Sequence, residues 1–246
     1  MKIVSNNFYI YGKHPVLFSL KNKKREFFKI YTSNIEELKK YIQDNKINVK
    51  HNIIEYKTNN ELNKFFAENI NHQGYVASVS KNKNFTIDDF VNSIKNQKQL
   101  PRIVILDQLT DPHNIGAIIR TAIAFNVEYV ITTKYNSPKD YSVIVKSSAG
   151  MSELINIIEV VNINNTIETL KKCGYFVIGM AGEAKQDIKE IKDSNNLCLV
   201  IGSEGNGIRQ LVKKNCDELY KITTNSEVES LNASVATAIA IYKLWG

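Results

Sequence analysis

The residues best suited to chemistry lie near the end of the chain. Residues 202–207 hold three glycines around Glu204, between an apolar run that predicts a strand and a segment with helical periodicity. Glycines at such a junction let the backbone approach a ligand and leave N–H groups free to bind it. The segment predicts a binding loop, although any tight α/β connection can contain glycine. Its G-x-x-G-x-G spacing excludes the dinucleotide fingerprint.

Ser230 and Asn232 form a second polar group, after a predicted strand at 219–222 and a polar turn. We expect both residues at the mouth of the last helix, where side-chain oxygens commonly cap backbone donors. Capping alone would explain them. An apolar stripe on this helix includes Val235, Ile239 and Tyr242, and alanines keep its other faces small.

A third polar loop, residues 107–114, ends in Asn114 and follows a predicted strand at 103–106. The helix after it places isoleucines on one stripe, and Arg120 lies off that stripe among small residues. Another surface could pack there with the guanidinium projecting from it. An ordinary exposed arginine is the alternative interpretation.

The elements that must position these loops alternate between strands and helices. Strands are predicted at 103–106, 129–132, 154–161, 175–180, 197–201 and 219–222, with helices between them, including one at 139–149. This alternation is typical of a mostly parallel sheet, whose binding sites lie at the carboxyl ends of the strands. The loops after Leu106, Ile201 and Ile222 can therefore converge.

The N-terminal part has shorter units. Strands are predicted at 8–11, 27–31, 53–56 and 74–79, and helices at 35–45 and 61–67, which together make a small α/β sandwich. Residues 81–100 show no clear strand and one short helix at 88–94, so we interpret them as a linker. The predicted domains are therefore residues 1–80 and 101–246.

Charge is distributed unevenly. Residues 1–100 carry 17 Lys/Arg against 9 Asp/Glu, a net charge of +8, whereas residues 101–246 carry 15 against 16, a net charge of −1. An N-terminal domain that approaches a polyanion would have this distribution, and so would a solvated basic face. The basic turn 21–25 is a candidate phosphate contact.

The cysteines and the apolar runs bear on metal binding, disulfide bonds and membrane association. The three cysteines are scattered, with no histidine at ligand spacing, which predicts neither a disulfide framework nor a metal site. No apolar run reaches the length of a signal peptide core or a membrane span. We therefore expect a cytoplasmic protein with no membrane or metal partner.

Three blocks of the sequence resemble the SpoU (TrmH-type) RNA ribose 2′-O-methyltransferases of the SPOUT superfamily. Residues 111–122 resemble the first family motif, residues 202–207 the second and residues 230–236 the third. Residues 1–80 resemble the L30e-like RNA-binding domain of the large-subunit (23S) rRNA guanosine methyltransferases, notably at 10–14 and 72–77. Thr223 and Met180 depart from the family pattern, since relatives often have Pro and Thr there.

The resemblance implies an α/β SPOUT domain with a deep C-terminal trefoil knot, preceded by the L30e-like sandwich. It implies S-adenosylmethionine as cofactor, with Gly202, Ile222 and Leu231 at the cofactor positions, and a homodimer. Residues 101–246 would form the methyltransferase domain, and residues 1–80 would bind rRNA.

The implied reaction is methylation of a ribose 2′-hydroxyl of a guanosine in the peptidyl-transferase region of 23S rRNA. Arg120 matches the family's candidate for activating that hydroxyl. Because arginine hardly ever loses its proton, we expect it to stabilise the developing alkoxide or to hold the adjacent phosphate, and we leave a base role open. The residues expected to orient Arg120 and the ribose are Asn114, Glu204, Ser230 and Asn232.

Three other functions remain open at this stage. The least specific is a generic nucleotide-binding α/β protein, which cofactor binding would test directly. A tRNA guanosine 2′-O-methyltransferase is another, although relatives that act on tRNA commonly lack the L30e-like domain. A non-catalytic RNA-binding assembly factor is the third, and the presence of the polar motif residues weighs against it.

Overall fold

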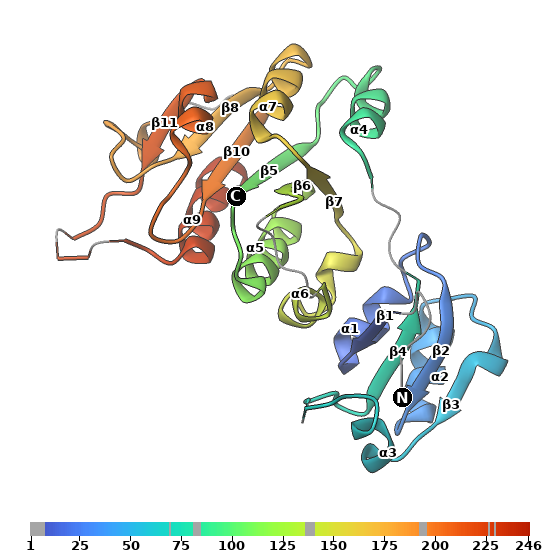
Figure 1. Ribbon diagram of the computed structural model, residues 1–246. Helices are drawn as coiled ribbons and strands as arrows, with labels where there is room; N and C mark the ends of the chain where they lie inside the picture. The colour runs from blue at the N-terminus through green and yellow to red at the C-terminus, as the bar shows by residue number, and fades with distance from the viewer. Residues whose placement is uncertain are drawn as a thin grey trace. The chain divides into compact units, whose positions relative to one another are not determined.

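A computed structural model describes residues 8–246 apart from 69, 81–84, 136–140, 192–195, 226 and 229. The chain divides into two compact units. The first joins Met1–Lys83 with Tyr141–Leu154, and the second joins Asn84–Asp140 with Ile155–Gly246 (Figure 1).

The first unit is built on a four-stranded sheet of order β1-β4-β2-β3. Its strands are β1 (Phe8–Tyr11), β2 (Phe27–Thr32), β3 (Ile54–Tyr56) and β4 (Tyr75–Val79). Strand β4 is antiparallel to both neighbours, while β2 and β3 are parallel. These strands confirm the four segments predicted from the sequence within one or two residues.

Helices of this unit cover a core that includes Ile10, Ile30, Leu38 and Tyr75. They are α1 (Lys13–Ser19), α2 (Ile35–Asp44), α3 (Asn59–Asn63) and α6 (Tyr141–Ser147), with short 3₁₀ turns η1 (His51–Ile53) and η2 (Met151–Glu153). Val145 of α6 is fully buried in the same core. The apolar face of α6 is therefore part of the N-terminal unit.

Helix α3 is shorter than the predicted segment 61–67. It begins at a capping box, in which Thr58 and Glu61 each accept a hydrogen bond from the other's backbone N–H. The two phenylalanines that follow the helix contact tyrosines of the sheet: Phe65 packs against the rings of Tyr9 and Tyr31. This packing takes the chain out of the helical path.

A buried ion pair fixes the segment 141–154 to the rest of the first unit. Glu153 accepts hydrogen bonds from Arg25 Nε at 3.0 Å and Nη2 at 2.5 Å, and from Asn22 Nδ2 at 3.1 Å. Arg25 Nη1 also donates to the carbonyl of Ser80. Arg25 is therefore committed to Glu153, which corrects the prediction that it serves with the basic turn as a phosphate contact.

The two units differ from the predicted domain boundaries in two places. Helix α4 (Ile87–Ile94) lies in the segment interpreted as a linker, yet it buries Phe90 and Ile94 in the core of the second unit. Segment 141–154 belongs to the first unit although it connects two strands of the second. The predicted helix at 139–149 is α6, and residues 139–140 lie outside the described residues.

The second unit is built on a seven-stranded parallel sheet of order β7-β6-β5-β10-β8-β11-β9. The strands are β5 (Arg102–Asp107), β6 (Val127–Thr133), β7 (Asn156–Val160), β8 (Phe176–Met180), β9 (Gln186–Asp187), β10 (Leu197–Gly202) and β11 (Glu218–Lys221). Every neighbouring pair is parallel. The parallel α/β architecture predicted from the sequence is confirmed.

Helices cover both faces of this sheet. Side chains of α4, α7 (Ile163–Lys172) and α8 (Gln210–Asn215) share one core with alternate residues of β5 and β10. Helices α5 (Pro112–Ala124) and α9 (Ala233–Trp245) contact each other and lie together in Figure 1. The helix that carries Asn114 and Arg120 and the helix that Asn232 caps therefore form one pair.

Helix α9 buries Ile241 and several small residues, and exposes three large apolar side chains. Ala233, Thr237 and Ala240 are buried, whereas Val235, Ile239 and Tyr242 are 48%, 39% and 68% exposed. The apolar stripe predicted on this helix is thus on the outside of the chain. Two of the alanines that were expected to keep its other faces small, Ala233 and Ala240, are buried within the chain.

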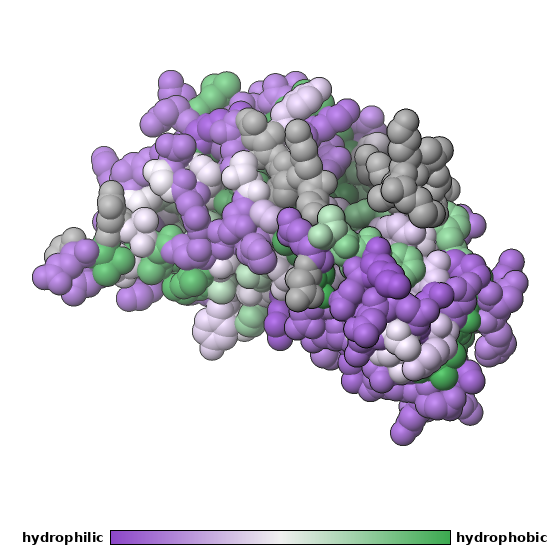
Figure 2. Space-filling view, turned by 60° about the horizontal axis from the view of Figure 1, so that its bottom comes forward, coloured by the Kyte–Doolittle hydropathy of each residue, from purple (hydrophilic) through white to green (hydrophobic). Residues whose placement is uncertain are grey.

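Exposed apolar residues are otherwise scattered. Hydrophilic residues cover most of the face shown in Figure 2. Among the described residues, no helix is long and apolar enough to cross a membrane.

Candidate active site

The carboxyl ends of three strands bring the polar loops to one edge of the second sheet. Gly202, the last residue of β10, pairs in register with Asp107, the last residue of β5. On the other side of β10, β8 pairs with β11, whose end precedes Ile222. The convergence predicted for the three loops is therefore present in the fold.

Three predicted site residues form one hydrogen-bonded cluster. Asn114 Nδ2 donates to Glu204 Oε1 at 2.8 Å, and Asn232 Nδ2 donates to the same oxygen at 2.5 Å. Asn232 Nδ2 also lies 3.1 Å from Asn114 Oδ1. Each residue comes from a different loop, so the cluster connects segments up to 118 positions apart in sequence.

Local sequence explains how the two asparagines are presented. Asp111 caps α5 by accepting from the backbone N–H of His113 at 2.9 Å, with a proline in the first turn, which leaves Asn114 in that turn. Asn232 caps α9 through Oδ1, which accepts from Ser234 N at 2.9 Å. Capping and clustering are thus compatible, because the amide of Asn232 caps with its oxygen and donates with its nitrogen.

Gly202 is required by the way the glycine-rich loop folds back. A Cβ at this position would lie 2.0 Å from the carbonyl carbon of Gly207 and 2.2 Å from Ile208 N. Ser203 and Gly207 exchange two backbone hydrogen bonds, which close the loop on itself. The loop reverses directly over the end of β10.

Asp107 and Arg209 are positioning residues that sequence reasoning missed. The fully buried Asp107 carboxylate accepts from Arg209 N at 2.9 Å, Nε at 2.8 Å and Nη2 at 2.7 Å. It thereby fixes the far end of the glycine-rich loop to the end of β5. The sequence did show an acidic residue at the end of a buried strand. It did not show that the partner of this residue lies 102 positions away.

The loop after β11 is held by Asp187. Its Oδ2 accepts from the backbone N–H of Thr223 at 3.1 Å. Hydrogen bonds from the Thr223 side chain and the Lys189 backbone hold the pKa of Asp187 below its usual range. Proline has no N–H to donate, so threonine at this departure from the family pattern gives the loop an anchor that proline would not supply.

Arg120 is separate from the cluster within one chain. It is exposed on α5, and no ion pair involves it among the described residues. Six residues separate it from Asn114, about 9 Å along the helix and well round its circumference. Its guanidinium is thus available to a substrate or to another surface.

Ser230 is the other polar residue that does not join the cluster. It is exposed and lies ahead of α9, whose cap is Asn232. The helix starts three residues later than predicted. Ile222 and Leu231 are half-buried, near the two ends of the one connection between β11 and α9.

The three cysteines are free thiols. Burial raises the pKa of Cys216 to about 12. The described residues hold no group of three metal-ligating side chains.

Two family models match the sequence. The SpoU rRNA methylase family matches residues 101–242, and the RNA 2′-O ribose methyltransferase substrate-binding domain matches residues 9–85. The 23S rRNA (guanosine-2′-O-)-methyltransferase RlmB of Vibrio parahaemolyticus is 34% identical over 241 residues, which cover 97% of this chain and 96% of that protein. The RlmB of Vibrio cholerae is 37% identical over 177 residues, covering 72% and 71%.

Solved structures share the fold. The AdoMet-bound rRNA methyltransferase from Sinorhizobium meliloti superposes with a TM-score of 0.77 at 20% identity, over 97% of this chain and 86% of that one. The SpoU methyltransferase AviRb from Streptomyces viridochromogenes in complex with AdoMet also gives 0.77 at 20% identity, over 97% and 89%.

Proposed function

The chain belongs to the SpoU rRNA methylase family, and on that premise we propose that it methylates the ribose 2′-hydroxyl of a guanosine in 23S rRNA. It is an enzyme of the methyltransferase class, and its cofactor is S-adenosylmethionine. The target carries over from the RlmB proteins, to which the chain is similar over most of its length. By the same resemblance, the guanosine lies in the peptidyl-transferase region.

The observation that carries this proposal is the cluster of Asn114, Glu204 and Asn232. Three separate motif segments meet in it through direct hydrogen bonds. An idle domain would have no need to keep two amides and a carboxylate together on an exposed edge. This supports catalysis over a purely structural role in RNA assembly.

The residues at this edge fit the cofactor. Gly202, Ile222 and Leu231 lie on or next to the loops at the carboxyl ends of β10 and β11, where parallel sheets commonly bind ligands. The two half-buried aliphatic side chains offer apolar contact, and the loops offer backbone hydrogen bonds. S-adenosylmethionine supplies a methyl group that its sulfonium charge already activates.

The chain's own contribution is positioning and charge. The ribose 2′-oxygen would take the methyl group of the cofactor as the cofactor's own carbon–sulfur bond breaks, and the hydroxyl proton would leave to solvent. The guanidinium of Arg120 would stabilise the negative charge that develops on that oxygen. Asn114, Glu204 and Asn232 orient the ribose. Ser230, on the same loop as Asn232, contributes a further hydroxyl.

We also infer a homodimer. Val235, Ile239 and Tyr242 expose an apolar stripe on α9, and a second copy would bury it. Helix α5, which carries Arg120, contacts the same helix. A dimer would therefore bring Arg120 of each copy near the shared face, and the deep C-terminal knot of the family would form in each copy. The rRNA substrate implies a cytoplasmic protein.

Arg120→Ala tests the catalytic assignment. It removes charge stabilisation but no cofactor contact, so turnover on 23S rRNA should fall by about 10²-fold or more while S-adenosylmethionine binding by calorimetry stays within about twofold. Lys172→Ala removes one exposed charge from α7, on the opposite face of the sheet, and should leave both quantities unchanged.

The choice of RNA is tested in the same assay. Transfer of labelled methyl to 23S rRNA, with none to a tRNA pool, is the expected result. Transfer to tRNA alone would assign the tRNA function. Equal loss of methyl transfer and cofactor binding in Arg120→Ala, with the dimer intact, would remove Arg120 from the reaction.

A further inference from the structure

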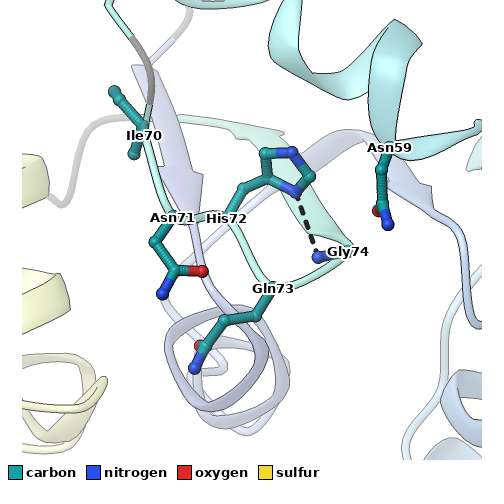
Figure 3. Close-up of a pocket in the computed structure, with 6 residues that line it drawn as sticks. All are labelled: Asn59, Ile70, Asn71, His72, Gln73 and Gly74. Carbon is teal, nitrogen blue, oxygen red and sulfur yellow. Dashed lines mark hydrogen bonds between the residues drawn. The ribbon is translucent and has the colours of Figure 1, made fainter.

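The first unit contains a polar pocket at the end of its sheet. About 420 Å³ in volume, it lies between the start of α3 and the turn that leads into β4. Figure 3 shows its lining residues, which are Asn59, Ile70, Asn71, His72, Gln73 and Gly74. Its amides can both donate and accept hydrogen bonds, as the edge of a nucleobase requires.

The turn that forms the pocket is rigidly built. Gln73 and Gly74 have φ values of 53° and 78°, and Tyr75 N donates to His72 O at 2.9 Å. His72 Nδ1 accepts from Gly74 N at 3.0 Å, so its Nε2 holds the proton and faces Asn63 Oδ1 at 3.0 Å. His72 therefore acts as a neutral support. In Figure 3, the side chains of Asn71 and Gln73 extend to the same side of the chain, away from His72.

The charge at this pocket comes from an unexpected part of the sequence. Lys146 lies on α6, in the connection between β6 and β7, yet its Nζ donates to Asn71 O at 2.9 Å and to Gln73 Oε1 at 3.2 Å. The ammonium also lies 5.8 Å from the centre of the Tyr11 ring. A Cβ on Gly12 would approach Nζ to 2.7 Å, so the glycine gives the ammonium its room.

These contacts orient Gln73 as well. Its Oε1 accepts from both Lys146 Nζ and the backbone N–H of Lys13 at 3.2 Å. The amide of Gln73 is thus fixed with its oxygen toward Lys13 and Lys146 and its NH₂ group away from them. A lysine ammonium has three N–H donors, and the two protein acceptors leave one for a ligand.

We propose that this pocket binds one nucleotide of the RNA substrate, with its phosphate at Lys146 and its base edge against the amides of Asn71 and Gln73. The inference rests on the proposed function, which requires RNA. It makes Lys146 a recognition residue that the methyltransferase sequence contributes to the N-terminal unit. The net charge of +8 on residues 1–100 favours a polyanion over an uncharged ligand.

Three variants of the full chain test the site, with a labelled 23S rRNA transcript as probe in fluorescence anisotropy. Lys146→Met should weaken RNA binding about five- to tenfold and lower the slope of log Kd against log salt by about 0.7–0.9, the value for one lost phosphate contact. Lys146→Arg should restore the slope. Gln73→Asn, which tolerates the left-handed backbone, should weaken binding without changing the slope.

Lys50→Met is the matched control. Lys50 is exposed at the amino end of β3, whereas the pocket is at the carboxyl ends of β2 and β3, so this variant should bind within about twofold of wild type at low salt. S-adenosylmethionine binding should be unchanged in every variant.

Each outcome decides the proposal. If wild type methylates 23S rRNA and Lys146→Met binds it as Lys50→Met does, the pocket is refuted while the enzyme function stands. Weaker binding with an unchanged salt slope would make Lys146 a structural residue only. Should Lys146→Met fail to fold, an unchanged affinity of Gln73→Asn would reject the site. Absence of methylation by wild type would instead reject the function.

Discussion

The ion pair between Arg25 and Glu153 gives the sharpest stability prediction. The two side chains are 1% and 0% exposed, and Glu153 accepts three hydrogen bonds, two of them from Arg25. Glu153→Gln keeps the shape of the side chain but removes its charge and turns one acceptor into a donor. The guanidinium then stays buried with no counter-ion.

The magnitude follows from that burial. Removing one partner of a buried pair typically costs about 3–5 kcal/mol, a large share of the 5–15 kcal/mol that stabilises a domain. For a unit of about 100 residues this corresponds to a fall in Tm of at least about 12 °C. Glu36→Gln breaks an ion pair of the same unit in which Glu36 is 87% exposed, and should cost less than about 1 kcal/mol.

Calorimetry of the full chain is the assay, with S-adenosylmethionine binding as a check on the second unit. The double variant Arg25→Met/Glu153→Met should be more stable than Glu153→Gln, because no unpaired charge remains. If Glu153→Gln unfolds within about 2 °C of wild type, or if the two sites act additively, the pair does not hold segment 141–154 in place.

Two further predictions concern the glycine-rich loop and pH. Gly202→Ala should abolish S-adenosylmethionine binding, since its Cβ would lie 2.0 Å from backbone; Gly182→Ala, where a Cβ meets nothing within 4 Å, is the control, and normal binding by Gly202→Ala would contradict the loop geometry. Hydrogen bonds from Lys13 and Tyr75 lower the pKa of Glu37 below its ordinary 4.5. The folded state binds this proton less tightly than the unfolded chain, so Glu37 stabilises above pH 4.5 and the benefit disappears as pH falls through the folded pKa. The Tm difference between wild type and Glu37→Gln should thus shrink from pH 7 to pH 3, and a difference independent of pH would exclude this linkage.

Local patterns were enough to predict every strand but one and most of the helices. The apolar run 103–106 became β5, which is one residue longer at each end, and the run 197–201 became β10, which is one residue longer at its carboxyl end. Strand β9, two residues long, has no such pattern and was missed. The last helix starts at Ala233 because Asn232, and not Ser230, supplies the capping oxygen. Both residues are good caps, so sequence alone could not choose between them.

The candidate site was predictable only for residues that can be selected by their position after a strand. Asn114, Glu204 and Asn232 could be selected as polar residues after strands, and their cluster follows from a parallel sheet. The bond between Asp107 and Arg209 depends on which strands are neighbours, and strand order is not encoded in local periodicity. Membership of 141–154 in the first unit likewise depends on the distant partner Arg25.

The path of the chain limits how this protein can be divided. Because the chain leaves the second unit at 140 and returns at 155, a cut near residue 80 would leave Glu153 and the apolar side of α6 facing water. A chimera that exchanges only the first 80 residues must therefore supply an arginine that pairs with Glu153 and an apolar surface against which Val145 packs. The first unit is thus made of two separate chain segments, and any version of it moved to another protein must include residues 141–154.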